Sequence, residues 1–118
     1  MAAKDRLGRR GERIAADFLR RQGYELLARN WRCPTGEIDI VARDGRTVVV
    51  CEVKTRSGER YGSPAEAVTD DKADRLRRLA GEWLRGWGRP HGGLRIDVVA
   101  VRVLPAGGYA VEHLLGVA

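Results

Sequence analysis

The stretch from Gly36 to Arg56, GEIDIVARDGRTVVVCEVKTR, places four ionisable residues inside two apolar, strand-like runs. They are Glu37, Asp39, Glu52 and Lys54. Carboxylates that face one another across a strand pair destabilise it, so a sheet gains little from this pattern unless a cation lies between them. In proteins Mg²⁺ is typically held by one or two carboxylates together with water and substrate phosphate. The pattern therefore predicts a divalent metal site.

The turn between the two runs predicts which of these side chains meet. With Asp44-Gly45 as a two-residue hairpin loop, Glu37 opposes Glu52, and Asp39 is the diagonal neighbour of Glu52. Side chains alternate along a strand, so the three acids and Lys54 are expected to project from one face of the sheet. A longer loop would shift the register and separate them.

Asp39 and Glu52 are the carboxylates that we expect to hold this metal, as Mg²⁺ or Mn²⁺. A metal there would bind a phosphate oxygen and lower the pKa of a bound water, which becomes a nucleophile at neutral pH. Lys54 lies two residues after Glu52. Its ammonium is expected to orient or deprotonate that water and to stabilise the charge that grows during attack on phosphorus. This is the chemistry of phosphodiester hydrolysis.

The rest of the chain supplies the elements that must position these groups. Apolar residues at helical spacing predict a helix over 8–22, and alternation predicts a strand over 24–31. After the hairpin and a second helix, strands are expected over 94–104 and 109–115. The order α-β-β-β-α-β-β predicts a single α/β domain over 1–118, with a mixed sheet flanked by helices.

Both predicted helices bring charged residues toward the sheet. Glu12 shares the inward face of the first helix with Leu19, seven positions later. The second helix is expected to begin with Ser63 as its cap, Pro64 in its first turn and Glu66 as capping-box partner. Its apolar stripe is expected to contain Ala73, Leu76, Ala80, Trp83, Leu84 and Trp87. Lys72 lies close to that stripe, and Gly8 and Gly11 are expected to let the first helix approach the sheet closely.

Charge and composition narrow the class of partner. The 118 residues carry a net charge of +6 with a sequence pI of about 10.0, which favours a polyanion such as nucleic acid. No run approaches the ~18 apolar residues of a membrane span, and no signal-peptide core follows the basic N-terminus, so we expect a cytoplasmic protein without a membrane partner. Cys51 is expected to fill the core, and His91 and His113, without evident partners, to be structural.

These motifs carry a family resemblance. GEID followed by VVVCEVK resembles the D...(D/E)XK signature of the restriction-endonuclease-like PD-(D/E)XK nuclease superfamily, with Asp39, Glu52 and Lys54 in the motif positions. With GRRGERIAADFLRR, EVKTRSG, GSPAEAV and RIDVV added, nearly the whole chain resembles the YraN-like family of bacterial endonuclease-like proteins. That family is similar to archaeal Holliday-junction resolvases. The resemblance implies the nuclease fold and adds Glu12 to the catalytic and metal-binding acids.

Each of these residues also has a simpler interpretation. Glu12 could pair with a neighbouring arginine on its helix, and Glu37 could lie at an exposed strand end. Lys72 could contact phosphate or be an ordinary helix-surface charge. The loop after the motif offers phosphate or base contacts for nucleic acid, or it is simply solvated. Its candidate nucleic-acid-binding residues, together with Lys72, are Arg56, Arg60 and Tyr61.

The function that these observations predict is a Mg²⁺-dependent nuclease acting on DNA, with branched or otherwise structured DNA as the expected substrate. One alternative is a nucleic-acid-binding protein that keeps the nuclease fold but has little or no turnover, and another is a metal-free interaction module. Metal-dependent cleavage would support the nuclease, binding without cleavage would support the second function, and the absence of both would support the interaction module. The sequence leaves open the preference for DNA over RNA and the oligomeric state, with a homodimer as one option.

Overall fold

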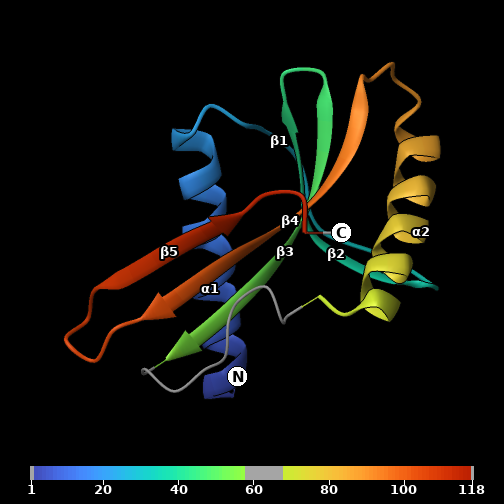
Figure 1. Cartoon of the computed structure of the whole chain (residues 1–118). Coiled ribbons are helices and arrows are strands. Elements are labelled where there is room, and N and C mark those ends of the chain that lie inside the picture. Colours follow the sequence, from blue (N-terminus) through green and yellow to red (C-terminus); the bar gives the residue numbers. More distant parts are fainter. Residues whose placement is uncertain (1, 58–67, 118) are drawn as a thin grey trace.

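Two helices enclose one five-stranded sheet in the computed structural model, which describes residues 2–57 and 68–117. In chain order the elements are α1 (Ala3–Arg21), β1 (Glu25–Cys33), β2 (Gly36–Asp44), β3 (Thr47–Ser57), α2 (Asp70–Trp87), β4 (Gly93–Val103) and β5 (Tyr109–Leu114). Strands lie side by side in the order β1-β2-β3-β4-β5, with β3 and β4 parallel and the other neighbours antiparallel. The predicted α/β architecture and the order α-β-β-β-α-β-β are confirmed (Figure 1).

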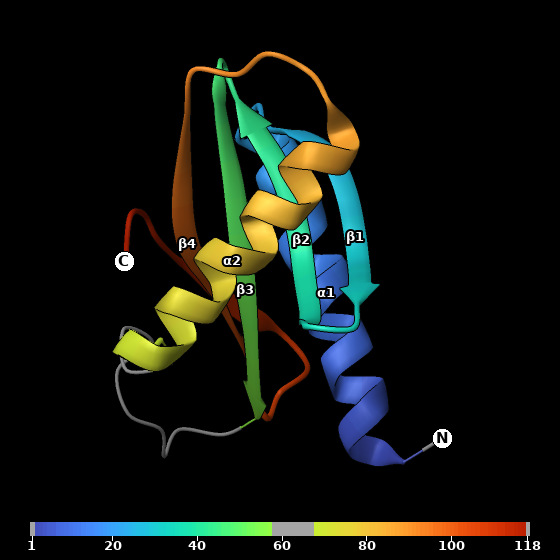
Figure 2. The ribbon, with the colours of Figure 1, turned by 90° about the vertical axis from the view of Figure 1, so that its right-hand side faces the viewer.

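The two helices cover opposite faces of the sheet. Figure 2 shows α2 in front of the strands and α1 behind them. One apolar cluster joins α1 to the sheet through side chains such as Leu19 and Val99, and the other joins α2 through Leu79 and Val50. Because both faces are covered, β3 and β4 read as nearly continuous apolar runs. Cys51 is fully buried in the first cluster, as predicted.

Helix α1 begins at Ala3, five residues before the predicted start at residue 8, so Gly8 and Gly11 lie inside the helix and not at its start. The two glycines differ in their surroundings. A Cβ on Gly11 would lie 1.9 Å from Thr55 Oγ1 on β3, whereas a Cβ on Gly8 would meet nothing within 4 Å. The predicted close approach to the sheet is thus confirmed at Gly11 and wrong at Gly8.

The hairpin between β2 and β3 turns one residue later than predicted. Asp44 pairs with Thr47, so the two-residue loop is Gly45-Arg46 instead of Asp44-Gly45. Gly45 has φ of 60°, and glycine in the first position of such a loop is typical of a type II′ turn. The predicted pairing of Glu37 with Glu52 is therefore wrong.

Helix α2 begins with a cap that the sequence analysis did not identify. Thr69 Oγ1 accepts a hydrogen bond from the Lys72 backbone N–H at 3.2 Å. The capping residues predicted further upstream, Ser63, Pro64 and Glu66, lie outside the described residues. Within α2, Leu76, Leu79, Ala80 and Trp83 are buried, and of these only Leu79 was absent from the predicted stripe.

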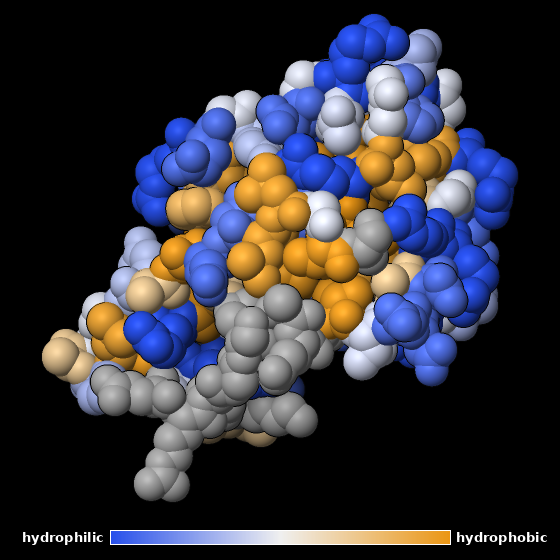
Figure 3. Space-filling view, in the orientation of Figure 1, coloured by the Kyte–Doolittle hydropathy of each residue, from blue (hydrophilic) through white to orange (hydrophobic). Residues whose placement is uncertain are grey.

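On the face shown in Figure 3, apolar side chains gather over the middle of the molecule and hydrophilic side chains form its margin. Among the described residues, the large apolar side chains that are exposed are Tyr109 and Leu115. Both cysteines, Cys33 and Cys51, are free. No helix in the described part of the chain is long and apolar enough to cross a bilayer.

Candidate active site

The candidate site lies where β2 and β3 separate. Their paired residues run from Asp44 with Thr47 to Ile40 with Cys51, and beyond the last pair the strands diverge, β2 toward α2 and β3 away from it (Figure 1). Just past this point the Val53 backbone N–H donates a hydrogen bond of 2.8 Å to Asp39 Oδ2. The carboxylate of Asp39 therefore bridges the two strands at the fork.

Strand β2 changes its packing at Asp39. Ile38 belongs to the apolar cluster under α2 and Ile40 to the cluster under α1, although residues two apart in a regular strand share a face. On β1, Asn30 lies opposite this position, between the pairs Arg29 with Ile40 and Trp31 with Ile38. Its φ of 51° is left-handed, which interrupts the ladder there.

Because of this irregularity, the expectation that all four ionisable side chains project from one face is wrong. The structure divides them into two groups at the fork. One group contains Glu12, Glu37 and Asp39, and the other contains Glu52 and Lys54 with a lysine from α2.

The first group is a trio of acids. Glu12 from α1 and Glu37 and Asp39 from β2 each place one carboxylate oxygen within 4.8 Å of the others. Burial, together with the charges of Glu52, Glu12 and Glu37, raises the pKa of Asp39 to about 7, although the Val53 hydrogen bond opposes the shift. An acid in such surroundings is stabilised by any cation that enters.

The second group centres on Glu52, which the structure leaves out of the trio. Its Oε1 lies 2.5 Å from the Nζ of Lys72 on α2 and 3.7 Å from the Nζ of Lys54. Only 12% of the Glu52 side chain is exposed. Burial, followed by the charge of Lys72, lowers the pKa of Lys54, although Glu52 opposes the shift. A lysine with a lowered pKa loses its proton more readily than an ordinary lysine.

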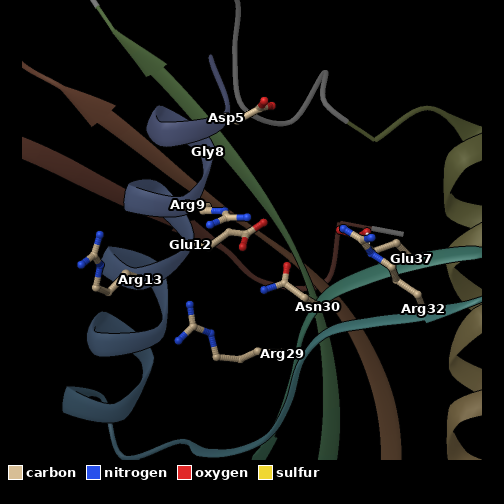
Figure 4. Close-up of a pocket in the computed structure, with 9 residues that line it drawn as sticks. All are labelled: Asp5, Gly8, Arg9, Glu12, Arg13, Arg29, Asn30, Arg32 and Glu37. Carbon is tan, nitrogen blue, oxygen red and sulfur yellow. The ribbon is translucent and has the colours of Figure 1, made fainter. Parts of the chain in front are cut away.

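A basic groove of about 970 Å³ opens from the trio between α1 and β1 (Figure 4). Four arginines line it, namely Arg9, Arg13, Arg29 and Arg32. The other lining residues are Asp5, Gly8, Glu12, Asn30 and Glu37. In Figure 4, Glu12 extends from α1 toward the strands. Arg32 Nε donates to Glu37 Oε2 at 2.6 Å. The groove therefore brings guanidinium groups alongside two of the three acids, an arrangement suited to phosphate groups.

The predicted nucleic-acid-binding residues do not all lie at the candidate site. Lys72 is near the site, where its ammonium holds Glu52. Arg56 is exposed at the end of β3 and donates to the Thr55 carbonyl at 2.9 Å. Arg60 and Tyr61 lie outside the described residues. The groove arginines were not predicted, although Arg9 and Arg13 flank Glu12 in the sequence and could have been selected on that ground.

A separate buried acid was also missed. Asp97 on β4 has no exposed surface, and its carboxylate accepts hydrogen bonds from Arg95 and from the Gly116 backbone N–H. His113 Nε2 lies 2.7 Å from Asp97 Oδ2, so the expectation that this histidine lacks a partner is wrong. Arg95 also donates to the Tyr24 hydroxyl at 2.7 Å. This network ties β5 and the end of the chain to β4.

Comparisons of the sequence with known proteins identify one family. Residues 11–101 match the model of the uncharacterised protein family UPF0102. A UPF0102 protein of Beutenbergia cavernae is 55% identical over 117 residues, 99% of each chain. One from Streptomyces coelicolor is 55% identical over 120 residues, covering 100% of this chain and 92% of the relative. Among solved structures, Archaeoglobus fulgidus Hjc, a Holliday junction resolvase, is similar with a TM-score of 0.44 and 24% identity, covering 87% of this chain and 74% of that one.

Proposed function

The chain belongs to the uncharacterised protein family UPF0102, and we propose that it is a Mg²⁺- or Mn²⁺-dependent nuclease that hydrolyses phosphodiester bonds of DNA. The substrate we propose is branched or otherwise structured DNA, processed in the cytoplasm during recombination or repair. One observation carries the proposal: carboxylates from α1 and β2 converge next to a groove lined by four arginines, and Glu52, whose charge also raises the pKa of Asp39, lies 3.7 Å from Lys54.

The donor set fits a hard divalent cation. All of the candidate ligands are carboxylate oxygens, which Mg²⁺ and Mn²⁺ prefer. The trio would hold the cation through Asp39 and Glu12, with Glu37 beside them and Glu52 as the further ligand across the fork. The raised pKa of Asp39 supports this assignment, because a group of partly buried carboxylates lacks compensating charge. When bound, such a cation supplies charge neutralisation at phosphate and a more acidic water.

Lys54 is the residue that we assign to proton transfer. Its ammonium lies 3.7 Å from Glu52 Oε1, and its lowered pKa makes its proton easier to release than that of an ordinary lysine. In its charged form it would stabilise the negative charge that grows on the phosphoryl oxygens.

The phosphate backbone of the substrate would be held from two directions. The groove arginines come from α1 and β1, whereas Lys72 comes from the start of α2 and Arg56 from the end of β3. Arg60 and Tyr61, which follow in the sequence and lie outside the described residues, remain candidates for contacts with nucleic acid. Guanidinium groups suit phosphate because they bind its oxygens in bidentate fashion.

A nucleic-acid-binding protein with little turnover is the second candidate, and a specific contact favours it. Glu52, one of the proposed ligands, is held by lysine in the structure instead of joining the trio. If that contact persists when DNA binds, the basic surfaces would bind nucleic acid without cleaving it.

A cleavage assay decides between the two candidates. The purified protein is incubated with linear, flapped and four-way DNA in Mg²⁺, in Mn²⁺ and in EDTA. We expect metal-dependent cleavage that Glu12→Gln abolishes. The matched control is Asp17→Asn, which removes an acid from the exposed side of the same helix, where it pairs with Arg20, and should leave cleavage unchanged. Binding of all substrates without cleavage in either metal would refute the nuclease.

Binding is tested separately from chemistry. Without metal, affinity for duplex DNA should fall with salt at a slope of about −0.9 per neutralised phosphate. Asp39→Asn removes a negative charge, so it should preserve or strengthen this binding while abolishing cleavage. Arg56→Ala should weaken binding and reduce the salt slope by about one. If neither variant alters binding or cleavage in a folded protein, the proposed site is wrong.

A further inference from the structure

Lys72 occupies a position where a helix ordinarily avoids a cation. It is the third residue of α2, directly after Asp70 and Asp71 and capped through Thr69. The N-terminus of a helix carries partial positive charge, so acids are favoured in the first turn and a lysine there is unfavourable. Its ammonium is compensated by Glu52, 2.5 Å away on β3. The contact between helix and strand is therefore the interaction that stabilises a lysine at this position.

This ion pair is better shielded than the others around the site. The side chains of Lys72 and Glu52 are 22% and 12% exposed, whereas Arg32, which pairs with Glu37, is 77% exposed. Exposed pairs contribute little because solvent screens them, and shielded pairs are strongly coupled. Glu52 is thus held firmly on the α2 side of the fork, while Glu37 is held weakly on the other side.

We propose that Lys72 is a positioning residue that serves as the resident counter-cation of Glu52 and competes with the divalent cation for that carboxylate. In the structure the ammonium contacts Glu52 Oε1, and Glu52 is not among the three acids whose carboxylate oxygens lie within 4.8 Å of one another, although its charge acts on Asp39. A divalent cation on the trio recruits Glu52 only when Lys72 releases it. Lys72 therefore lowers the metal affinity of the site. This inference rests on the metal site of the proposed function.

A double-mutant cycle on metal binding tests the competition without nucleic acid or turnover. Mn²⁺ affinity is measured by calorimetry on the full chain for the parent, Lys72→Met, Glu52→Gln and the double variant. Removing any positive charge near a metal strengthens binding somewhat, so the cycle is needed to isolate the effect that passes through Glu52. We expect Lys72→Met to strengthen Mn²⁺ binding about tenfold in the parent and less than about twofold in the Glu52→Gln background.

The control is Lys54→Met, which removes the same charge 3.7 Å from the same oxygen and should strengthen Mn²⁺ binding less than Lys72→Met. Tryptophan fluorescence reports whether each variant is folded, and Lys72→Gln replaces Lys72→Met if the latter unfolds. Equal strengthening in both backgrounds, or no strengthening by Lys72→Met or Lys72→Gln, would overturn the role of Lys72.

The outcome separates this role from the nuclease assignment. If the cycle shows the expected coupling but no DNA substrate is cut, the enzyme proposal fails and the role of Lys72 stands. If DNA is cut and the cycle shows no coupling, the nuclease stands and the competition is wrong. If the folded parent and Lys72→Met both fail to bind Mn²⁺ at millimolar concentration, the competition is overturned together with the metal site.

Discussion

Asp39 on β2 and Asp97 on β4 lie on either side of β3, and they are shielded acids with opposite surroundings. Asp97 is fully buried, and although burial alone would raise its pKa, hydrogen bonds from His113, Arg95 and Gly116 outweigh that effect and lower it. Around Asp39 the neighbours are acids, and its pKa is raised to about 7. The same side chain is stabilised in its charged form at one position and destabilised at the other.

The difference indicates which acid is part of the fold and which is available for chemistry. Every partner of Asp97 comes from the chain itself, so the network needs nothing from outside. Asp39 accepts a hydrogen bond from Val53, and the charges that act most on its pKa are those of the acids Glu52, Glu12 and Glu37, so it is stabilised by adding a cation. Asp97 is the more shielded of the two and is nevertheless the one stabilised in its charged form, so the balance of charge, not shielding from solvent, accounts for the difference.

The largest expected effect follows from removing the charge of Asp97, the acid whose partners all come from the chain itself. Asp97→Asn leaves the guanidinium of Arg95 without its carboxylate and weakens the contact with His113. We expect a loss of about 3–5 kcal/mol in the free energy of unfolding, measured by urea denaturation at pH 7. Because the pKa of Asp97 is lowered in the folded state, its contribution is present above pH 4 and disappears in more acidic solution. A loss below about 1 kcal/mol would show that the network is not structural.

The next effect compares Arg95, which pairs with Asp97, with Lys54 of the candidate site, which lies near Glu52. Hydrogen bonding to Asp97, ahead of the other influences, raises the pKa of Arg95, while burial lowers the pKa of Lys54. Lys54→Arg keeps the charge and removes the ability to lose a proton. Cleavage should fall at least about 100-fold, or about 2.7 kcal/mol in activation free energy, with little change in stability. An arginine variant that cuts as fast as the parent would reduce Lys54 to an electrostatic contact.

A smaller effect is expected from the packing that brings Glu12 to the trio. Gly11→Ala places a methyl group against Thr55, whose Cβ would lie only 2.7 Å away, so α1 must move from β3. We expect a loss of about 2 kcal/mol in stability and weaker Mn²⁺ binding, since the helix also carries Glu12. The matched variant Gly8→Ala meets no neighbour and should stabilise the protein by about 0.5–1 kcal/mol through helix propensity. Equal stability and equal Mn²⁺ affinity of the two variants would contradict the close contact between Gly11 and Thr55.

The smallest expected effect is on the pH dependence of stability, where Asp39 acts in the opposite direction to Asp97. The folded state raises the pKa of Asp39 from 3.8 to about 7, so between these values the native state holds a proton that the unfolded state releases, and stability falls as pH rises. Asp39→Asn removes this dependence. The variant should match the parent near pH 4 and exceed it by about 1–2 kcal/mol at pH 8, a fraction of the full shift because solvent reaches the site. Urea denaturation from pH 4 to 8 measures the difference, and a variant less stable at pH 8 would contradict it.

How much the sequence could predict depends on the range of the interactions involved. The elements and their order follow from local periodicity and were predicted correctly. The hairpin register was not, because Gly45 can serve as the first or the second residue of a tight turn and local sequence does not decide between them. The catalytic roles of Glu12, Asp39, Glu52 and Lys54 remain predictions.

The remaining differences arise from contacts between distant segments. The left-handed backbone of Asn30 breaks the alternation at Asp39, and no pattern around either residue signals it. The Lys72 contact with Glu52 depends on where the start of α2 meets β3, and the Asp97 network joins residues as far apart as Tyr24 and His113. These arrangements depend on the assembled sheet, so sequence spacing alone could not predict them.

The hydrogen bond from Val53 to Asp39 gives the site its own spectroscopic reporter. An amide proton shared with a carboxylate changes its NMR resonance when that carboxylate gains a proton or a metal ion. The Val53 ¹⁵N–¹H signal should therefore titrate with an apparent pKa of about 7 in the absence of divalent ions and shift again on addition of Mg²⁺. One backbone resonance thus follows protonation and metal occupancy at the fork, with no label attached and no substrate present.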